Sequence, residues 1–141
     1  MRLDWATLAN AAEARDGLLY LQGAGWDAAI RSSYPAPFLG ALAMRLIFHP
    51  RELGRPHELM VELVTADGQD VIPPIRHRVE VRLSAEHPTH EEVPYPIAVN
   101  VSALSIESPG TYALEVFLDD THLKTLTFSF QPPATGGAPP A

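Results

Sequence analysis

Apolar and polar side chains alternate along the C-terminal third of the chain. From Tyr112 to Leu118 every second residue is apolar, and a second alternating run ends at Phe130. The dipeptide Asp119-Asp120 separates the two runs. Because successive side chains of a β-strand point to opposite faces, this period of two residues predicts two strands, and the short acidic break predicts a hairpin turn between them.

A second pair of alternating segments lies in the middle of the chain. His57–Thr65 carries apolar residues at every second position, and Asp67-Gly68 follows it. Asp-Gly is a strong turn signal, because glycine adopts a positive φ without steric cost. Alternation returns over Ile75–Leu83, after Pro73-Pro74 has interrupted the chain. The pattern predicts a second hairpin with a break or an open edge at the prolines.

Two further segments are more continuously apolar. Phe38–Phe48 contains one charge, Arg45, and therefore predicts a central strand that is buried on both faces. Tyr95–Ile106 carries Ile97, Val99 and Val101 on one face and predicts another strand.

The N-terminal segment allows two interpretations. Leu3–Ala14 is rich in alanine, so its intrinsic propensity favours a short helix, but a strand is the alternative. Asp16-Gly17 then predicts a turn into a strand over Leu18–Leu21.

Together these segments predict an all-β chain. We expect a single β-sandwich, immunoglobulin-like or C2-like, of about seven to nine short antiparallel strands with little or no helix. The sandwich domain would span residues 1–130, and residues 131–141, rich in proline, glycine and alanine, would form a disordered tail. Gly110 and Tyr112 open a late strand as in the tyrosine corner of immunoglobulin-like sandwiches, in which the hydroxyl bonds to upstream backbone.

Composition and charge narrow the function classes. The 141 residues carry a net charge of −7 and include no cysteine. The lack of cysteine excludes disulfides and thiolate chemistry, and the acidic balance argues against nucleic-acid binding. No signal peptide or membrane-spanning pattern is present, so we expect a cytoplasmic protein without a membrane or nucleic-acid partner. The excess of arginine over lysine, with many alanines and prolines, suggests a bacterial source.

The order of these motifs resembles that of a family of uncharacterised bacterial all-β proteins, a domain of unknown function of about this length. The resemblance rests on Leu3–Ala12, Gly17–Ala24, the Asp67-Gly68 hairpin and the Pro109–Tyr112 turn, with an aromatic-proline loop and a long apolar strand between them. It implies an all-β sandwich in which Leu3–Ala11 is a strand that pairs with Gly17–Ala24. It implies no activity and assigns no catalytic residue or cofactor.

The segment His87–Glu92 is the candidate metal site. His87, His90 and Glu91 are residue types that bind zinc, which needs three or four converging ligands. The alternative is a solvated surface loop, because Pro88 lies within the segment and Pro94 follows it.

Aspartates in the two predicted turns suggest a calcium site as a third possibility. Asp67 and Asp70 lie at one turn, and Asp119 and Asp120 lie at the other. Calcium takes six to eight oxygen ligands, so this site requires both turns to meet at one end of the fold. The alternative is that aspartate is an ordinary turn residue.

The remaining candidates point to binding rather than to catalysis. Phe117 is predicted to face outward, opposite the core residues of its strand, and is the candidate interface residue. His49, His57 and His122 are isolated at strand ends, and no nucleophile motif is present. We therefore expect a non-catalytic module that recruits a protein partner or self-associates, without a cofactor. The alternative is a small metal-binding protein or metal-dependent enzyme that uses the His87–Glu92 loop.

Overall fold

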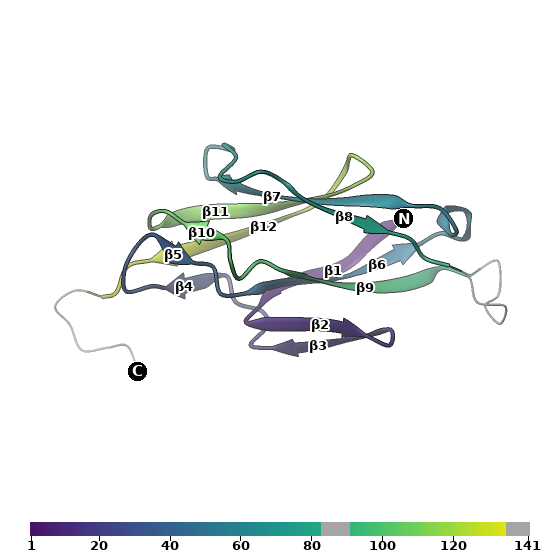
Figure 1. Cartoon of the computed structure of the whole chain (residues 1–141), viewed down its shortest axis with the longest axis horizontal. Helices are drawn as coiled ribbons and strands as arrows, with labels where there is room; N and C mark the ends of the chain where they lie inside the picture. Colours follow the sequence, from purple (N-terminus) through teal and green to yellow (C-terminus); the bar gives the residue numbers. More distant parts are fainter. Residues whose placement is uncertain (83–90, 135–141) are drawn as a thin grey trace.

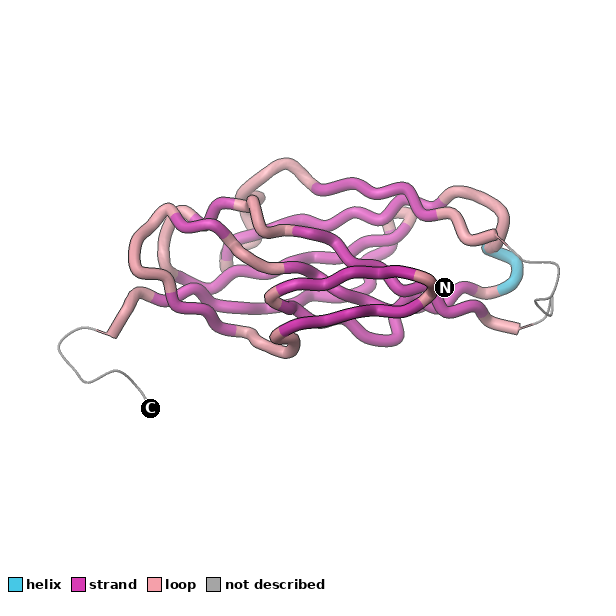
Figure 2. The backbone as a smooth tube through the Cα atoms, turned by 60° about the horizontal axis from the view of Figure 1, so that its bottom comes forward, coloured by secondary structure: helices cyan, strands magenta, loops and turns pink. Residues whose placement is uncertain are grey.

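A computed structural model describes residues 1–82 and 91–134. The chain is all-β, as predicted, and the helical structure of the described residues is one 3-10 turn, η1 (Pro50–Glu52) (Figure 2). None of the described residues forms a helix with the length and apolarity that crossing a membrane requires. The strands are β1 (Arg2–Ala9), β2 (Ala11–Arg15), β3 (Leu18–Gln22), β4 (Ala28–Ile30), β5 (Ala36–Pro37), β6 (Ala41–Phe48), β7 (His57–Thr65), β8 (Ile75–Val79), β9 (Val93–Asn100), β10 (Ser105–Ile106), β11 (Gly110–Leu118) and β12 (Thr121–Gln131).

Two sheets enclose one hydrophobic core (Figure 1). The larger sheet has five strands in the order β4-β12-β11-β7-β8, and the smaller has three in the order β1-β6-β9. The hairpin of β2 and β3 lies against the outer side of the smaller sheet, and β5 pairs with β10. The largest fully buried side chains are Phe38, Phe48, Phe128, Phe130, Leu42, Met44, Leu46, Leu59, Leu63, Ile106, Leu114 and Leu118.

The central strand of the smaller sheet is β6, which is buried on both faces as predicted. Leu42 and Met44 point into the core with the other even-numbered residues of the strand. Ala41 and Ala43 point the opposite way and are also buried, on the side where the β2–β3 hairpin packs. Small side chains at these positions let the hairpin approach the sheet closely.

The predicted C-terminal hairpin is confirmed. β11 pairs with β12, and both turn residues are left-handed, with φ of +49° at Asp119 and +64° at Asp120. This is the geometry of a type I′ turn, which matches the twist of the flanking strands. The Tyr112 hydroxyl donates a hydrogen bond to the Ser108 carbonyl at 2.6 Å, the upstream contact expected from the sequence.

The hairpin at Asp67-Gly68 is present but interrupted. Asp70 bridges to Val64 after the turn, and Pro73-Pro74 then separates this bridge from β8. The ladder with β7 resumes only at Ile75, because proline has no N–H to donate. The strand predicted over Ile75–Leu83 ends at Val79 in the structure, and Leu83 lies outside the described residues.

The N-terminal segment forms strands rather than a helix, but the expected partner is wrong. The resemblance placed Leu3–Ala11 against Gly17–Ala24. In the structure β1 pairs with β6, and the residues that pair with β3 are those of β2. The physical reason is burial: beside β6, β1 encloses Leu8 and Ala9 in the core, which a pairing with the exposed β3 could not do.

Two other features differ from the sequence prediction. The described residues form twelve strands, more than the seven to nine expected, because β4, β5 and β10 are pieces of two or three residues. β4 runs parallel to β12, so the prediction of antiparallel pairing throughout is wrong at this edge. β12 ends at Gln131, the first residue of the expected tail, and residues 135–141 of that tail lie outside the described residues.

Replacing Tyr112 with Phe should lower the free energy of unfolding by about 1 kcal/mol, the usual contribution of one such hydrogen bond. The ring is buried, so the loss isolates the hydroxyl bond to Ser108. Urea denaturation measures the change. The control is Tyr20→Phe, because Tyr20 is 45% exposed on the β2–β3 hairpin and should show almost no effect. Equal losses in the two variants would contradict a specific role for the Tyr112 hydroxyl.

Candidate functional site

The larger sheet ends at β8, which pairs with β7 and with no other strand of the part of the chain that the structure describes. Its register with β7 is regular from Ile75 to Val79. A strand at the end of a sheet leaves a row of backbone N–H and C=O groups without a strand partner. The direction of these groups decides which residues of β8 offer them.

That direction follows from the bonding of β7. Asp119 donates its N–H to the Glu58 carbonyl at 2.9 Å, so Glu58 turns its backbone groups toward β11. Its neighbour His57 therefore turns its groups toward β8 and Val79. Bonded pairs alternate along an antiparallel ladder, so Arg78, opposite Glu58, turns its N–H and C=O away from the sheet. By the same alternation Arg76 does so as well, and we call this open side of Ile75–Val79 the β8 edge.

Other edges of the two large sheets are less suited to accept a strand. β9 contains Pro94 and Pro96 at positions whose backbone nitrogens face away from β6, where proline is tolerated. The open side of β9 therefore lacks two backbone N–H donors. β1 has a register shift between Leu3 and Trp5, and such an irregularity hinders the addition of another strand to an edge. β4 is only three residues long. The β8 edge is regular and free of proline.

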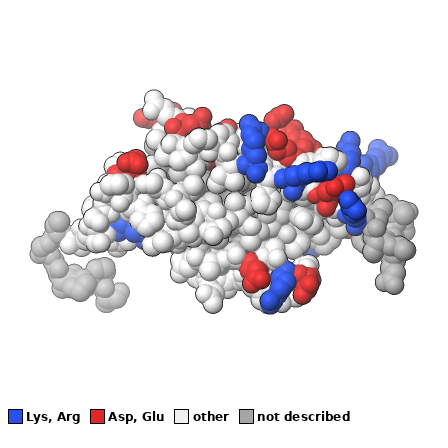
Figure 3. All heavy atoms as spheres, viewed as in Figure 1, with Lys and Arg blue, Asp and Glu red and all other residues white. Residues whose placement is uncertain are grey.

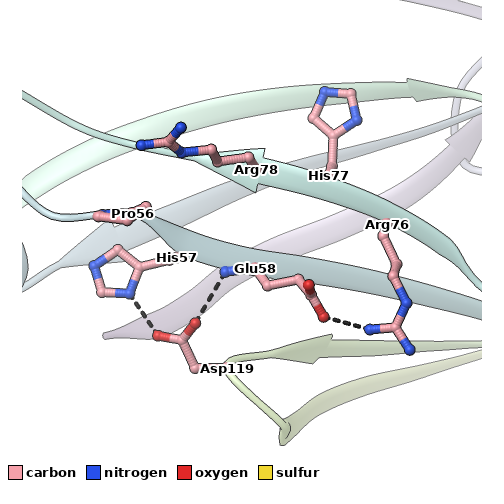
Figure 4. Close-up of a pocket in the computed structure, with 7 residues that line it drawn as sticks. All are labelled: Pro56, His57, Glu58, Arg76, His77, Arg78 and Asp119. Atoms are coloured by element: carbon pink, nitrogen blue, oxygen red, sulfur yellow. Dashed lines mark hydrogen bonds and ion pairs between the residues drawn. The ribbon is translucent and has the colours of Figure 1, made fainter.

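A hollow lies on the outer face of the sheet beside β8, the face that points away from the core (Figure 4). Its volume is about 470 Å³. We call it the outer hollow, and it is lined by Pro56, His57, Glu58, Arg76, His77, Arg78 and Asp119.

Arginine side chains surround the outer hollow. Arg76 forms an ion pair with Glu58, and Arg78 lies 3.4 Å from Glu80. The side chains of Arg76 and Arg78 remain 56% and 71% exposed, so water and ligands can reach them. Figure 3 shows Lys and Arg atoms gathered toward one end of this view of the molecule, together with carboxylates.

A second hollow lies in the space between β8 and β9. Its volume is about 160 Å³. We call it the inner hollow, and it is lined by Ala14, His77, Arg78, Val79, Tyr95, Pro96, Ile97 and Ala98. The two hollows therefore flank the β8 edge, and both are lined in part by His77 and Arg78.

The buried side chain of His57 fixes the base of this site. His57 is 3% exposed and begins β7. Its Nδ1 lies 2.5 Å from the Asp119 carboxylate, and its Nε2 lies 2.7 Å from the Glu52 carbonyl. The other oxygen of Asp119 accepts the Glu58 backbone N–H at 2.9 Å. We call this group, His57 with Asp119 and the Glu52 carbonyl, the His57 clamp, and it joins η1, β7 and the β11–β12 turn.

Both partners of the His57 ring accept hydrogen bonds, so the clamp holds a doubly protonated imidazolium. Burial has the largest influence on the pKa of His57 and lowers it. The hydrogen bond to the Glu52 carbonyl and the bond and charge of Asp119 outweigh burial, so the pKa of His57 is raised. Burial likewise raises the pKa of Asp119, but hydrogen bonds from His57 and Glu58 and the charge of His57 lower it overall.

Comparison with known proteins places the chain in a family. Residues 4–131 match the model of a family of unknown function, DUF6941. The chain belongs to this family. The match extends from β1 to β12, in agreement with the resemblance seen in the sequence. Comparisons with curated proteins and with solved structures gave no match. Membership of DUF6941 assigns no activity, so the function of this member is argued from its site.

Of the residues singled out in the sequence, Asp119 and His57 belong to this site. His87 and His90 lie outside the described residues, and Glu91 is exposed just before β9, so zinc binding there stays a prediction. Phe117 is half-buried on the outer face, opposite Met60 on β7 and 5.2 Å from the His122 ring. In the sequence His57 is one of several isolated histidines, because nothing there links it to a partner 62 residues away.

The calcium hypothesis is wrong for this fold. Asp67 follows Thr65, at the end of β7 that pairs with Tyr112, whereas Asp119 follows Leu118 at the other end of the same ladder. Six residue steps along the strand separate the two ends, which corresponds to about 20 Å. The aspartates of the two turns therefore cannot share one ion.

Neither His57 nor His122 is arranged as a general base. His57 has both ring nitrogens engaged and cannot accept a proton from a substrate. His122 contacts Glu115 and Thr125 through the same nitrogen, so it lacks the two-sided relay of a base held by a carboxylate. Within 1–82 and 91–134, no three His, Asp or Glu side chains gather as a metal site.

Replacing Asp119 with Asn should destabilise the protein by about 2 kcal/mol near pH 5.5 and flatten its stability–pH profile. Because the pKa of His57 is raised in the folded state, its protonation stabilises the protein below about pH 6.5, and this contribution is lost as the pH rises through the pKa of His57 in the folded protein. The lowered pKa of Asp119 gives stability present above about pH 4 and lost as the pH falls through its folded value. Urea denaturation between pH 3 and 9 measures both arms.

The control is Asp120→Asn, which changes the same charge in the same turn. Asparagine tolerates positive φ, so both variants keep the turn geometry. Only Asp119→Asn should flatten the profile, since an amide there favours a neutral His57. A parallel loss of pH dependence in the two variants would assign the effect to net charge instead of the His57 clamp.

Proposed function

We propose that this DUF6941 protein is a non-catalytic binding module that takes an extended segment of a partner protein onto the β8 edge as an additional strand. One observation carries the proposal: a regular, proline-free open strand is flanked by two hollows. In strand addition, backbone hydrogen bonds supply affinity, and hollows for alternate side chains supply specificity.

The proposal includes a finer description of the fold. We take the two facing sheets as an immunoglobulin-like β-sandwich, supported by the shared core and by the Tyr112 hydroxyl bound to upstream backbone. The bacterial source and the cytoplasmic location expected from the sequence stay predictions.

The β8 edge has the length that a short linear segment needs. Arg76 and Arg78 together offer two N–H and two C=O groups, spaced as the successive bonds of an antiparallel or parallel ladder. Pro73-Pro74 bars extension of the ladder upstream. An added strand would therefore be anchored over a few residues, which suits a module that recognises a peptide segment.

The outer face gives Phe117 a part in the same proposal. Phe117 lies opposite Met60, and Met60 lies opposite Arg76, so the three side chains form one row across the sheet from β11 to β8. The row places Phe117 and Met60 next to Arg76, which lines the outer hollow. A partner seated on the β8 edge could extend over this pair.

Arg78→Pro should abolish peptide binding at the β8 edge while the fold persists. Proline removes an N–H that faces away from the sheet, so no bond to β7 is lost. The probe is a peptide selected from a displayed random library with the wild-type protein as bait, and its affinity is measured by fluorescence anisotropy. Hydrogen exchange should show new protection of the Arg76 and Arg78 amides in the wild-type complex.

The matched control is Arg78→Ala, which removes the same charge and keeps the N–H. Binding should survive in this variant at reduced strength. Equal losses in the proline and alanine variants would show that the backbone takes no part. Failure to select any peptide that protects the β8 amides would overturn the proposal.

Phe117→Ser should weaken binding of the selected peptide several-fold and cost about 1 kcal/mol of stability, because the side chain packs on an exposed face rather than in the core. Ala113→Ser is the control, since Ala113 lies on the same face of β11 away from β8. Unfolding of the Phe117 variant, or unchanged binding, would remove Phe117 from the interface.

A further inference from the structure

We infer that the segment bound at the β8 edge carries acidic side chains at alternate positions, over the outer hollow, and small side chains between them, toward the inner hollow. This inference rests on the proposed strand addition and specifies its ligand.

The alternation follows from strand geometry. Successive side chains of an added strand point to opposite faces of the sheet. Those on one face come to lie beside Arg76 and Arg78, and those on the other face come to lie beside His77 and Val79. Directly opposed cross-strand side chains interact, so the two faces of β8 impose two different requirements on the ligand.

The outer face selects negative charge. Four arginines stand in or near the outer hollow, Arg55, Arg76, Arg78 and Arg82, and Arg55 is close enough to influence the pKa of His57 and Asp119. Among the described residues, the carboxylates near these arginines and the His57 imidazolium are those of Glu52, Glu58, Glu80 and Asp119, and Glu52 also pairs with the N-terminal amine. The local balance is positive although the whole chain carries −7.

The arginines keep donors available for a ligand. A guanidinium has five N–H groups, and Arg76 uses Nη1 for Glu58 while Arg78 uses Nη2 for Glu80. The remaining N–H groups can bind a second carboxylate with the planar geometry that suits Arg. The intramolecular ion pairs therefore orient the two side chains at the edge.

The inner face selects small side chains. The inner hollow has a volume of about 160 Å³, against about 470 Å³ for the outer hollow. Val79 and Ile97, which line it, are almost fully buried, so the space left at the edge suits a side chain of modest size.

An acidic partner segment also fits the charge better than a second copy of this chain. The protein is acidic overall, so two copies repel each other at long range, and arginines on an open edge resist pairing of two identical β8 strands. A short acidic segment meets the positive end without bringing a second acidic domain with it.

Three synthetic peptides of equal length test the inference: one with glutamate and valine in alternation, one with lysine for each glutamate, and one with the glutamates and valines in two blocks. Fluorescence anisotropy should give the alternating acidic peptide the lowest Kd, by about tenfold over both others. Raising the salt concentration should weaken its binding. Hydrogen exchange at Arg76 and Arg78 locates the peptide.

The double variant Arg76→Glu/Arg78→Glu should lose about tenfold in affinity for the acidic peptide and gain affinity for the lysine peptide. Arg15→Glu, on the β2–β3 hairpin, is the control for charge alone and should change neither. Arg76→Gln/Arg78→Gln serves as the second variant if reversal beside Glu58 and Glu80 unfolds the protein.

The outcomes separate the two proposals. Equal binding of the acidic and lysine peptides, with the β8 amides protected, overturns the inference and leaves strand addition standing. Equal binding of the block peptide reduces the recognition to general electrostatic attraction. A dimer in sedimentation that forms without peptide and is abolished by Arg78→Pro makes a second copy the occupant. Binding that never protects Arg76 and Arg78 overturns both proposals.

Discussion

A sheet that does not close into a barrel must end in strands whose outer backbone groups have no strand partner, and this constraint organises the surface of the protein. Pro94 and Pro96 remove donors from β9, a register shift bends β1, and β4 contributes three residues. β8 keeps a regular ladder and carries charge at Arg76 and Arg78. Charges on an open strand oppose its pairing with a second copy of the same strand. In the proposed strand addition, the same charges select the segment that the edge accepts.

The position of the β8 edge depends on the His57 clamp. β8 pairs with β7 alone among the described strands, so the position of β8 is set by the position of β7. His57, at the first position of β7, is opposite Val79, the last residue of β8. The ring is held from two sides by Asp119 and by the Glu52 carbonyl, and Asp119 also holds the Glu58 N–H. Loss of charge at His57 would therefore loosen the end of the ladder that carries Arg78.

The elements predicted well from the sequence are those whose partners are close in the chain. The Asp119-Asp120 hairpin is local, and its alternation and turn residues contain all the information that its pairing needs. β6 is long and apolar, so its central place also follows from its own residues. The partner of β1 does not follow from its own residues. Leu8 pairs with Leu42, which is more than thirty residues away, and neither sequence segment indicates which of several apolar strands it pairs with. The fold class was therefore predictable, and the pairing of the first strand was not.

The site was less predictable because its parts are ordinary when taken singly. Arg76 and Arg78 are polar residues of an alternating strand, a pattern that predicts exposure without predicting an open edge. Whether a strand is an edge depends on the order of the whole sheet, which places the chain's eighth strand at the end of the larger sheet beside β7 alone. His57 acquires its partner only when the β11–β12 turn arrives at the start of β7. The proposed binding site thus depends on sheet order, and a substitution that shifts the register of β7 against β11 would move the edge, the His57 clamp and both hollows together.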